Sequence, residues 1–279
     1  MGADYCAAVL SNRFDLLYLN GTLAKEQASI TGLQTGVVDM TTQTTAFVEP
    51  LIPRVQALDL PFLFARRQNA ERLLDGDVGR ELFAELAQKG IVGLAWGTAG
   101  WREFEFRDTR VKEPADMRGL RMRIQNGPVY VSMMKALGAI PVVIDFSETY
   151  TALAQKTIDG LDIPLTTILA QKFNEVTRNI ALSNHLYNPG PLLMSKQRYD
   201  SLTPEQQRVL VDASRDILPI WRNTFADAHT AAIEECKSKG VAVDAVDYPA
   251  FKRAMAPVYA EYRERLGRDV VDRIIKIAG

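Results

Sequence analysis

The sequence predicts an α/β protein built of two lobes. Segments with strand patterns alternate with segments of helical periodicity, which is typical of α/β layers in which most strands are parallel. Residues 33–39 and residues 153–159 share a short internal similarity. Each segment runs from a helix end through branched residues to an aspartate before a strand. Two lobes on a similar plan would enclose a cleft beside their strand ends, where open α/β sheets place ligands.

The first half of the chain alternates between the two periodicities. In order, the patterns predict a helix end over 3–11, a strand over 14–19, a helix over 24–33, a short strand from 37–40, a buried apolar turn at 59–64, one helix over 70–89, a buried strand over 91–96 and an exposed strand over 103–107. Gly90 closes the long helix, since glycine commonly follows a helix end.

A strand over 120–124 leads into a helix that starts at Pro128. Apolar residues alternate with Arg121 and Arg123, and this period of two puts both guanidinium groups on one side of the strand. Asn126 is expected to cap the helix, whose first N–H groups favour an anion. Guanidinium binds a carboxylate through two parallel hydrogen bonds. The stretch therefore predicts either an anion site or two solvated strand arginines.

The second half of the chain becomes increasingly helical. After a strand over 141–144, the patterns predict a helix through Lys156, a strand over 161–165, a helix from Thr203 to about Gly240, a strand over 241–243 and helices over 251–266 and 270–278. A capping box at 203–206 starts the long helix, and Pro219 should kink it. A helix of this length usually bridges lobes.

Composition excludes several classes of protein. The chain has 279 residues, 47% of them hydrophobic and 24% charged, so it is long enough for a large core and two lobes. The net charge is −1, which argues against nucleic acid or an anionic membrane as the main partner. No apolar run is long enough to span a bilayer, and no secretory signal is visible at the N-terminus.

Signatures of catalysis and metal binding are missing. Two cysteines, Cys6 and Cys236, leave one disulfide open but exclude a disulfide framework or a cysteine zinc site. His185 and His229 lack ligand spacing and triad partners, so ordinary packing explains them. There is no phosphate loop, no nucleophile elbow and no dinucleotide fingerprint. The sequence predicts no cofactor and lowers the odds of an enzyme.

Several segments in fixed order resemble the DctP-type solute-binding proteins of TRAP transporters, from about Phe14 to the C-terminus. These segments are Gly119–Gln125, Pro128–Tyr130, Ala136–Ala139, Phe146–Leu153 and Asp159–Gly160, with Asn20–Leu23, Val38–Met40, Leu58–Phe64 and Ser201–Gln207 outside that block. The resemblance implies a periplasmic protein with two α/β lobes around a hinged cleft and a long helix bridging them. Its ligand would be a small organic acid, delivered to a TRAP membrane permease.

The resemblance also implies a division of the chain and a set of site residues. Lobe I would comprise 1–100 plus about 189–228, and lobe II would comprise 101–188 plus about 229–279. In that family the second arginine of the Gly-Leu-x-x-Arg motif binds the ligand carboxylate, and here it is Arg123. The remaining candidate ligand-binding residues are Arg102, Phe146, Asn126, Tyr187, Asp162, Gln43, Thr44 and Trp101. Ordinary packing is the alternative for each.

Two departures from the family pattern alter the expectation. Many members carry Gln-Glu-Asn-Pro after the Asp-Gly turn, whereas this chain has Leu161–Pro164 with Ile163 in place of the asparagine. Ile163 cannot make the asparagine's hydrogen bond, so we expect a less polar pocket and a ligand with an apolar body. The chain is also expected to begin near the end of the family's first helix, lacking the first strand and most of that helix.

Two other classes of function stay open at this point. A cytoplasmic α/β enzyme acting on an organic acid would turn over a carboxylate. A ligand-sensing module would pass its signal to a receptor rather than to a permease. Neighbouring genes for a small and a large membrane subunit would favour transport over sensing.

Overall fold

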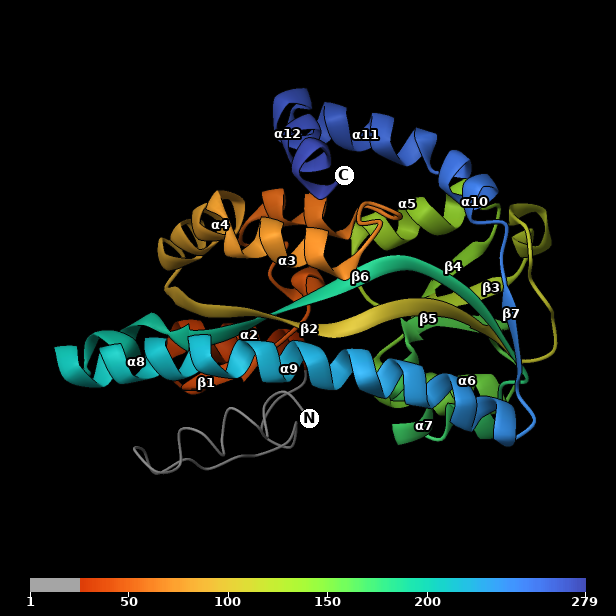
Figure 1. Cartoon of the computed structure of the whole chain (residues 1–279), viewed down its shortest axis with the longest axis horizontal. Helices are drawn as coiled ribbons and strands as arrows, with labels where there is room; N and C mark the ends of the chain where they lie inside the picture. The colour runs from red at the N-terminus through yellow and green to blue at the C-terminus, as the bar shows by residue number, and fades with distance from the viewer. Residues whose placement is uncertain (1–25) are drawn as a thin grey trace.

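One mixed sheet runs through the molecule in the computed structural model, which describes residues 26–279 (Figure 1). The predicted elements over 3–11 and 14–19 therefore lie outside the described residues. The strands are β1 (Met40–Thr42), β2 (Ile91–Phe106), β3 (Arg121–Ile124), β4 (Ile140–Val143), β5 (Gly160–Pro164), β6 (Asn179–Ser195) and β7 (Ala242–Ala245). Their order is β1-β6-β2-β5-β3-β4, with β7 beside β6.

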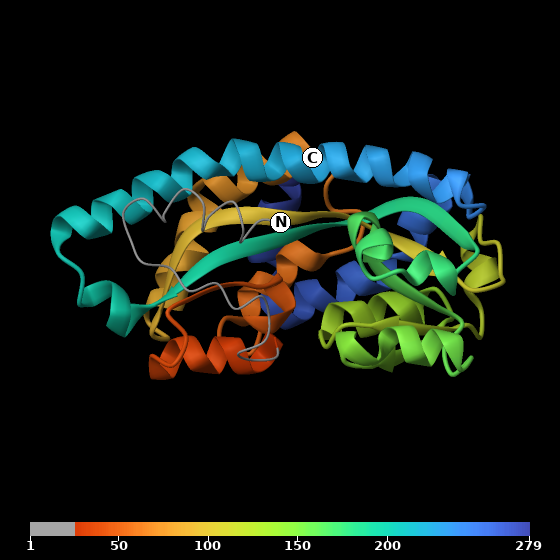
Figure 2. The same ribbon diagram turned by 90° about the horizontal axis from the view of Figure 1, so that it is seen from below.

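The antiparallel pair of β2 and β6 forms the long axis of the sheet (Figure 2). The two short strands predicted over 91–96 and 103–107 are one strand of 16 residues. The expectation that its second half is exposed is wrong, because α9 (Pro204–Ser238) packs on that face and leaves Glu103 and Glu105 fully buried. The α/β class is confirmed, yet β1–β6, β2–β5 and β2–β6 are antiparallel, so the sheet is not mostly parallel.

Helices cover both faces of the sheet. They are α2 (Glu26–Thr35), α3 (Arg67–Asp75), α4 (Asp77–Ala87), α5 (Pro128–Ala136), α6 (Thr149–Ala154), α7 (Leu165–Ala170), α8 (Lys196–Asp200), α9, α10 (Tyr248–Ala254), α11 (Ala256–Leu266) and α12 (Arg268–Ala278). The single helix predicted over 70–89 is two helices. Gly76 adopts an extended conformation between them, and this breaks the helix.

The long helix α9 connects both ends of the molecule (Figures 1 and 2). Thr203 Oγ1 accepts from the Gln206 N–H, and Gln206 accepts from the Thr203 N–H, so the predicted capping box is confirmed. The helix continues through Pro219 for 35 residues and curves along its length. It lies across β2, where Trp221 Nε1 donates to the Thr98 carbonyl at 2.9 Å.

The C-terminal helices return to the first lobe, which contains β1 and α2–α4. Asn69 Nδ2 in α3 donates to the Ala278 carbonyl at 2.8 Å, and Arg72 Nη2 donates to the Ile277 carbonyl at 3.0 Å. A large core joins these helices to α3–α5 and β3, while a second core around Leu161 lies among β5, α6, α7 and α9. Side chains at the junction of the two lobes are therefore held by both.

Candidate ligand-binding site

Arg123 is buried at the end of β3, with 4% of its surface exposed. Its Nε donates to the Ile144 carbonyl at 3.1 Å, and its guanidinium carbon lies 5.8 Å from the centre of the Phe146 ring. This distance lies within the range of a cation–π contact. Both partners follow β4, which pairs in parallel with β3. The strand pairing therefore brings Arg123 and Phe146 together, although they are far apart in sequence.

Arg121 has a different environment on the same strand. Its Nε and Nη2 bind the two carboxylate oxygens of Asp159 at 2.9 and 2.7 Å, and its side chain is 41% exposed. This ion pair raises the pKa of Arg121 and lowers the pKa of Asp159, with the side-chain hydrogen bonds as the main cause. Arg121 thus closes a surface ion pair, whereas Arg123 lies in the interior.

The first lobe contacts the second lobe close to Arg123. Thr44 Oγ1, just after β1, donates to Gln125 Oε1 at 3.3 Å. Gln125 directly follows β3, two residues beyond Arg123. Gln43 Nε2 donates to Ser29 Oγ in α2 at 3.1 Å and fixes the segment that carries Thr44. The Thr44–Gln125 contact brings the segment after β1 next to the end of the strand that carries Arg123.

Arg102 and Asp162 form a buried ion pair across β2 and β5. Arg102 Nε donates to Asp162 Oδ1 at 2.6 Å, Nη2 donates to the Asp162 carbonyl at 2.5 Å, and both side chains are almost fully buried. Burial by itself would raise the pKa of Asp162, but the charges of Arg102 and His185 lower it to about 2. The Asp162 charge offsets that of Arg102, so the two side chains form a neutral pair inside the sheet.

His185 supports the aspartate from β6. Its Nε2 lies 3.1 Å from Asp162 Oδ1, its Nδ1 lies 2.8 Å from Ser183 Oγ, and its ring stacks on Phe104 at 3.9 Å. Burial lowers the pKa of His185. The histidine is a packed core residue, as the sequence suggested.

Arg102 and Arg123 lie on opposite faces of the sheet. Phe104 is the register partner of Asp162, while Arg123 is the partner of Leu161, and neighbouring residues of β5 point to opposite faces. The Arg102 guanidinium lies 5.2 Å from the centre of the Tyr130 ring in α5. The two arginine side chains therefore do not contribute to the same site.

Two buried carboxyl groups of the first lobe were not singled out from the sequence. Thr45 Oγ1 donates to Asp59 Oδ1 at 2.7 Å, and Glu49 lies nearby. Burial raises the pKa of Asp59 to about 7, and burial together with the Asp59 charge raises that of Glu49 to about 9. Asp59 is also within electrostatic range of Arg102. In the sequence, Asp59 could have been identified as a carboxylate at the start of an apolar turn.

The remaining predicted site residues are Asn126, Trp101 and Tyr187. Gly127, not Asn126, is the N-cap residue of α5, and Asn126 is exposed, so the predicted cap is wrong. An extended glycine before Pro128 leaves the asparagine outside the first turn. Trp101 and Tyr187 contact each other with ring centres 5.2 Å apart, and both line a pocket against α9.

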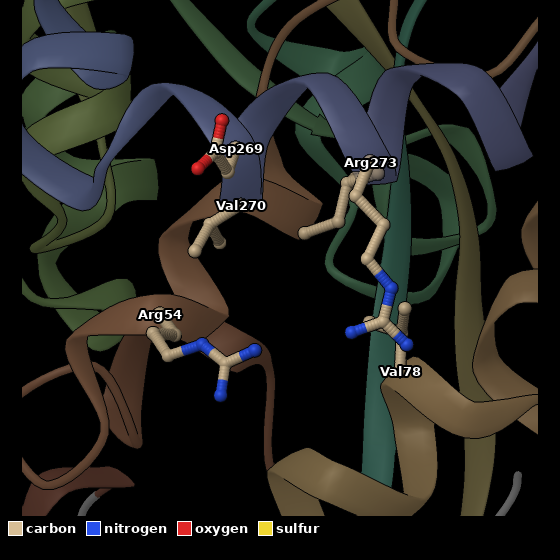
Figure 3. A pocket seen from close by; sticks show the side chains of 6 residues that line it. Arg54, Val78, Asp269, Val270 and Arg273 are labelled. Carbon is tan, nitrogen blue, oxygen red and sulfur yellow. The ribbon is translucent and has the colours of Figure 1, made fainter.

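One pocket lies beside α12, and a second lies beside α9. One, of about 200 Å³, lies where Arg54 and Arg273 extend toward a shared space beside Val78 (Figure 3). Both arginines pair with Glu81, and none of the predicted site residues lines this pocket. The other, of about 410 Å³, lies between α9 and the β2–β6 pair. Neither is lined by Arg123.

Within residues 26–279, no cluster of three or more histidine, cysteine or acidic side chains could hold a metal ion. The same part of the chain has no helix that is both long and apolar enough to cross a bilayer. Cys236 is buried in α9, and burial raises the pKa of its thiol to about 12. Cys6 lies outside the described residues, so pairing of the two stays open.

Comparison with known proteins identifies the family. Residues 16–265 match the model for bacterial extracellular solute-binding protein, family 7, also called DctP. The chain belongs to this family. It is 35% identical to the 2,3-diketo-L-gulonate-binding periplasmic protein of Escherichia coli, over 86% of this chain and 73% of that protein. It is 30% identical to the C4-dicarboxylate-binding periplasmic protein of Rhodobacter capsulatus, over 91% of this chain and 78% of that one.

A solved structure shares the DctP fold. The sugar acid-binding protein of Advenella mimigardefordensis, in complex with galactonate, superposes with a TM-score of 0.94 at 30% identity, covering 99% of this chain and 92% of that one. The resemblance to TRAP solute-binding proteins and the two-lobed α/β class are confirmed. The family binds solutes for transport.

Proposed function

We propose that this DctP protein captures a small organic acid and that Arg123 binds its carboxylate. The observation that carries the proposal is the burial of Arg123 at a strand end beside the Thr44–Gln125 contact between the lobes. A guanidinium held by the Ile144 carbonyl and the Phe146 ring is preorganised, which limits the cost of burying a carboxylate. The ligands named for the three relatives are also organic acids.

The two walls of the proposed site come from different lobes. Gln43 and Thr44 would contact the ligand from the first lobe, and Arg123 and Phe146 from the second. Ligand contacts satisfied together only in the closed state would favour closure. We propose the lobe division 1–100 plus 189–228 and 101–188 plus 229–279. We modify it at α12, whose hydrogen bonds to α3 favour movement with the first lobe.

The body of the ligand is proposed to be apolar at one point. Ile163, which stands where many members carry asparagine, is 3% exposed and belongs to the core around Leu161. An aliphatic side chain there offers no hydrogen bond to a hydroxyl group, so an alkyl or aromatic acid should be preferred over a sugar acid. Calorimetry with one acid of each kind tests this preference, and much tighter binding of the sugar acid would contradict it.

The protein is proposed to work in the periplasm and to deliver its ligand to a TRAP permease rather than to transform it. Membership of an extracellular solute-binding family supports this assignment. Binding and release require only lobe motion and a reversible salt bridge. Release of unchanged ligand after incubation, measured by mass spectrometry, tests it, and a transformed product would contradict it.

A thermal-shift screen tests the proposed ligand class. Dicarboxylates, 2-oxo acids, aromatic acids and sugar acids are added to the wild type and to Arg123→Ala. A ligand at about 100 times its Kd adds about 2.7 kcal/mol to the free energy of unfolding, which raises Tm by several degrees. We expect one class to shift the wild type but not the variant. An equal shift in both would remove Arg123 from the site.

A further inference from the structure

A second pocket lies on the face of the hinge strands opposite Arg102. Its volume is about 410 Å³, within the range of small-molecule sites. Trp101 and Tyr187 come from the connecting strands, Phe225 and His229 from α9, and Arg67 from the start of α3. Trp101 directly precedes Arg102 in β2, so the two side chains point to opposite faces. Neither Arg123 nor Phe146 lines this pocket, so it is distinct from the proposed site at Arg123.

One polar atom in each of two lining side chains has no hydrogen-bond partner within residues 26–279. Arg222 is held by Asp75 through two hydrogen bonds of 2.7 Å and by the Trp96 carbonyl at 2.7 Å, yet its buried Nε has no hydrogen-bond partner in the described part of the chain. Only 8% of its side chain is exposed. His229 Nδ1 is likewise buried without a partner among residues 26–279. A buried polar atom of this kind is costly unless a partner forms a hydrogen bond with it.

Irregular backbone of β6 bounds part of the pocket. Asn184 lines it with a positive φ of 43°, in the stretch where β6 shifts register against β2. The N–H groups of Ser183 and Asn184 both donate to Glu103 Oε2, at 2.6 and 2.8 Å. Glu103 Oε1 lies 3.7 Å from His229 Nε2. Strained backbone tied to a hinge strand concentrates at functional sites.

We propose that this pocket is a second binding site, for a small monocarboxylate with an aromatic body. Arg222 Nε can only donate, so it selects an acceptor oxygen. Arg67 Nε lies 3.2 Å from Glu71 and Arg222 is paired with Asp75, so the lining carries little net charge and suits a ligand of low charge. The rings of Trp101, Tyr187 and Phe225 provide flat apolar walls for the body.

A ligand in this pocket acts on the hinge. Arg67 belongs to the first lobe, whereas His229 contacts Glu103 in the strand that connects the lobes, so closure changes the spacing of the walls. A molecule that fits one lobe angle better than the other shifts the equilibrium between them. By linkage, the pocket and the cleft then alter each other's affinity by the same factor. This regulation would rest on the proposed function, but binding to the pocket would not.

Titration of 4-fluorobenzoate into the full chain, followed by fluorine NMR, tests the second site. We expect saturable binding that persists in Arg123→Ala and weakens about tenfold in both His229→Phe and Phe225→Ala, since each removes one wall contact of more than 1 kcal/mol. Ile220→Ala is the matched control, because Ile220 lies on α9 with 50% exposure and does not line the pocket. Thermal unfolding verifies that each variant is folded, and Trp101→Leu replaces any that is not.

The outcomes separate the two sites. No saturation with the wild type, or equal affinity in the wild type and the pocket variants, would overturn the second site. Loss of binding in Arg123→Ala alone would also overturn it, while supporting the cleft as the site for the acid. Binding that persists in Arg123→Ala and falls in the pocket variants supports the second site even if the cleft proposal fails.

Discussion

Arg102 and Arg123 are both almost fully buried, yet they have different partners. Arg102 binds Asp162, a carboxylate of the chain itself, and lies among the core side chains of β2, β5 and α5. Arg123 donates to a neutral backbone carbonyl and lies beside an aromatic ring at the junction of the lobes. Burial alone does not separate a structural arginine from a binding one. Their positions in the fold differ: Arg102 lies in the core of the sheet, and Arg123 lies near a strand end.

The largest expected effect on stability comes from removing the charged partner of Arg102. In Asp162→Asn the buried guanidinium loses its counter-charge, and such losses cost about 3–5 kcal/mol. We expect denaturant unfolding to show a fall of this size in the free energy of unfolding, because both side chains are almost fully buried. A loss below about 1 kcal/mol would mean that the ion pair is not a structural element.

Substitution of Arg123 should change ligand affinity rather than the free energy of unfolding. Arg123→Lys retains the charge but loses the planar fork that holds a carboxylate with two bonds. We expect the binding free energy for the acid found in the thermal-shift screen to weaken by about 1.5–3 kcal/mol, the size of one hydrogen bond to a charged group. Isothermal titration calorimetry measures the loss. Full affinity in the lysine variant would show that charge alone is recognised.

The carboxyl groups around Arg102 should make the free energy of unfolding depend on pH. Asp59 has a pKa of about 7 in the folded protein against an ordinary value of 3.8, because it is buried. Between these values the unfolded chain releases a proton that the folded chain keeps, so stability falls as pH rises. We expect the free energy of unfolding to decline from pH 4 toward pH 7, and Asp59→Asn to flatten that decline. A slope unchanged by the substitution would contradict this.

Asp162 gives the opposite slope in acid. Its pKa is about 2 in the folded protein and ordinarily 3.8, so the stability that it contributes is present above 3.8 and is lost as pH falls toward 2. We expect the acid branch of the stability profile to be weaker in Asp162→Asn than in the wild type. Unfolding curves at a series of pH values measure both branches. An acid branch that is equally steep in the two proteins would assign it to other carboxylates.

The smallest expected effect comes from the third arginine. Arg121 pairs with Asp159 at the surface, where solvent screens the charges. Asp159→Asn should therefore lower the free energy of unfolding by less than half as much as Asp162→Asn. The two substitutions remove the same group from the same kind of pair at different burial. Equal losses would show that burial does not govern these pairs.

The elements that local chemistry specifies were predicted well. The strand with Arg123 follows from strict alternation, and the start of α9 follows from Thr203 and Gln206. The strand β6 was missed, because Asn188–Pro191 resembles a loop although it runs through the middle of a strand. Burial of Glu103 could not be predicted either. It depends on the packing of α9 on β2, and these two elements are far apart in the sequence.

The candidate site shows the same limit. Arg123 was identified from a motif, but its contact with Phe146 and the Thr44–Gln125 contact depend on strand pairing and lobe packing. Asp162 was taken as a candidate ligand-binding residue before its partner was known, and the structure pairs it with Arg102. Trp101 and Tyr187 face α9 because alternation in β2 and β6 turns them away from Arg102. Glu49 and Asp59 are brought together only by tertiary folding.

A calorimetric cycle tests the central claim most directly. The acid identified by the screen and its uncharged primary amide are each titrated into the wild type and into Arg123→Ala. If Arg123 binds the carboxylate, changing the acid to the amide and removing the arginine each cost affinity, and the two losses together cost little more than one alone. Losses that add in full would contradict the account, as would equal binding of the acid by the wild type and Arg123→Ala.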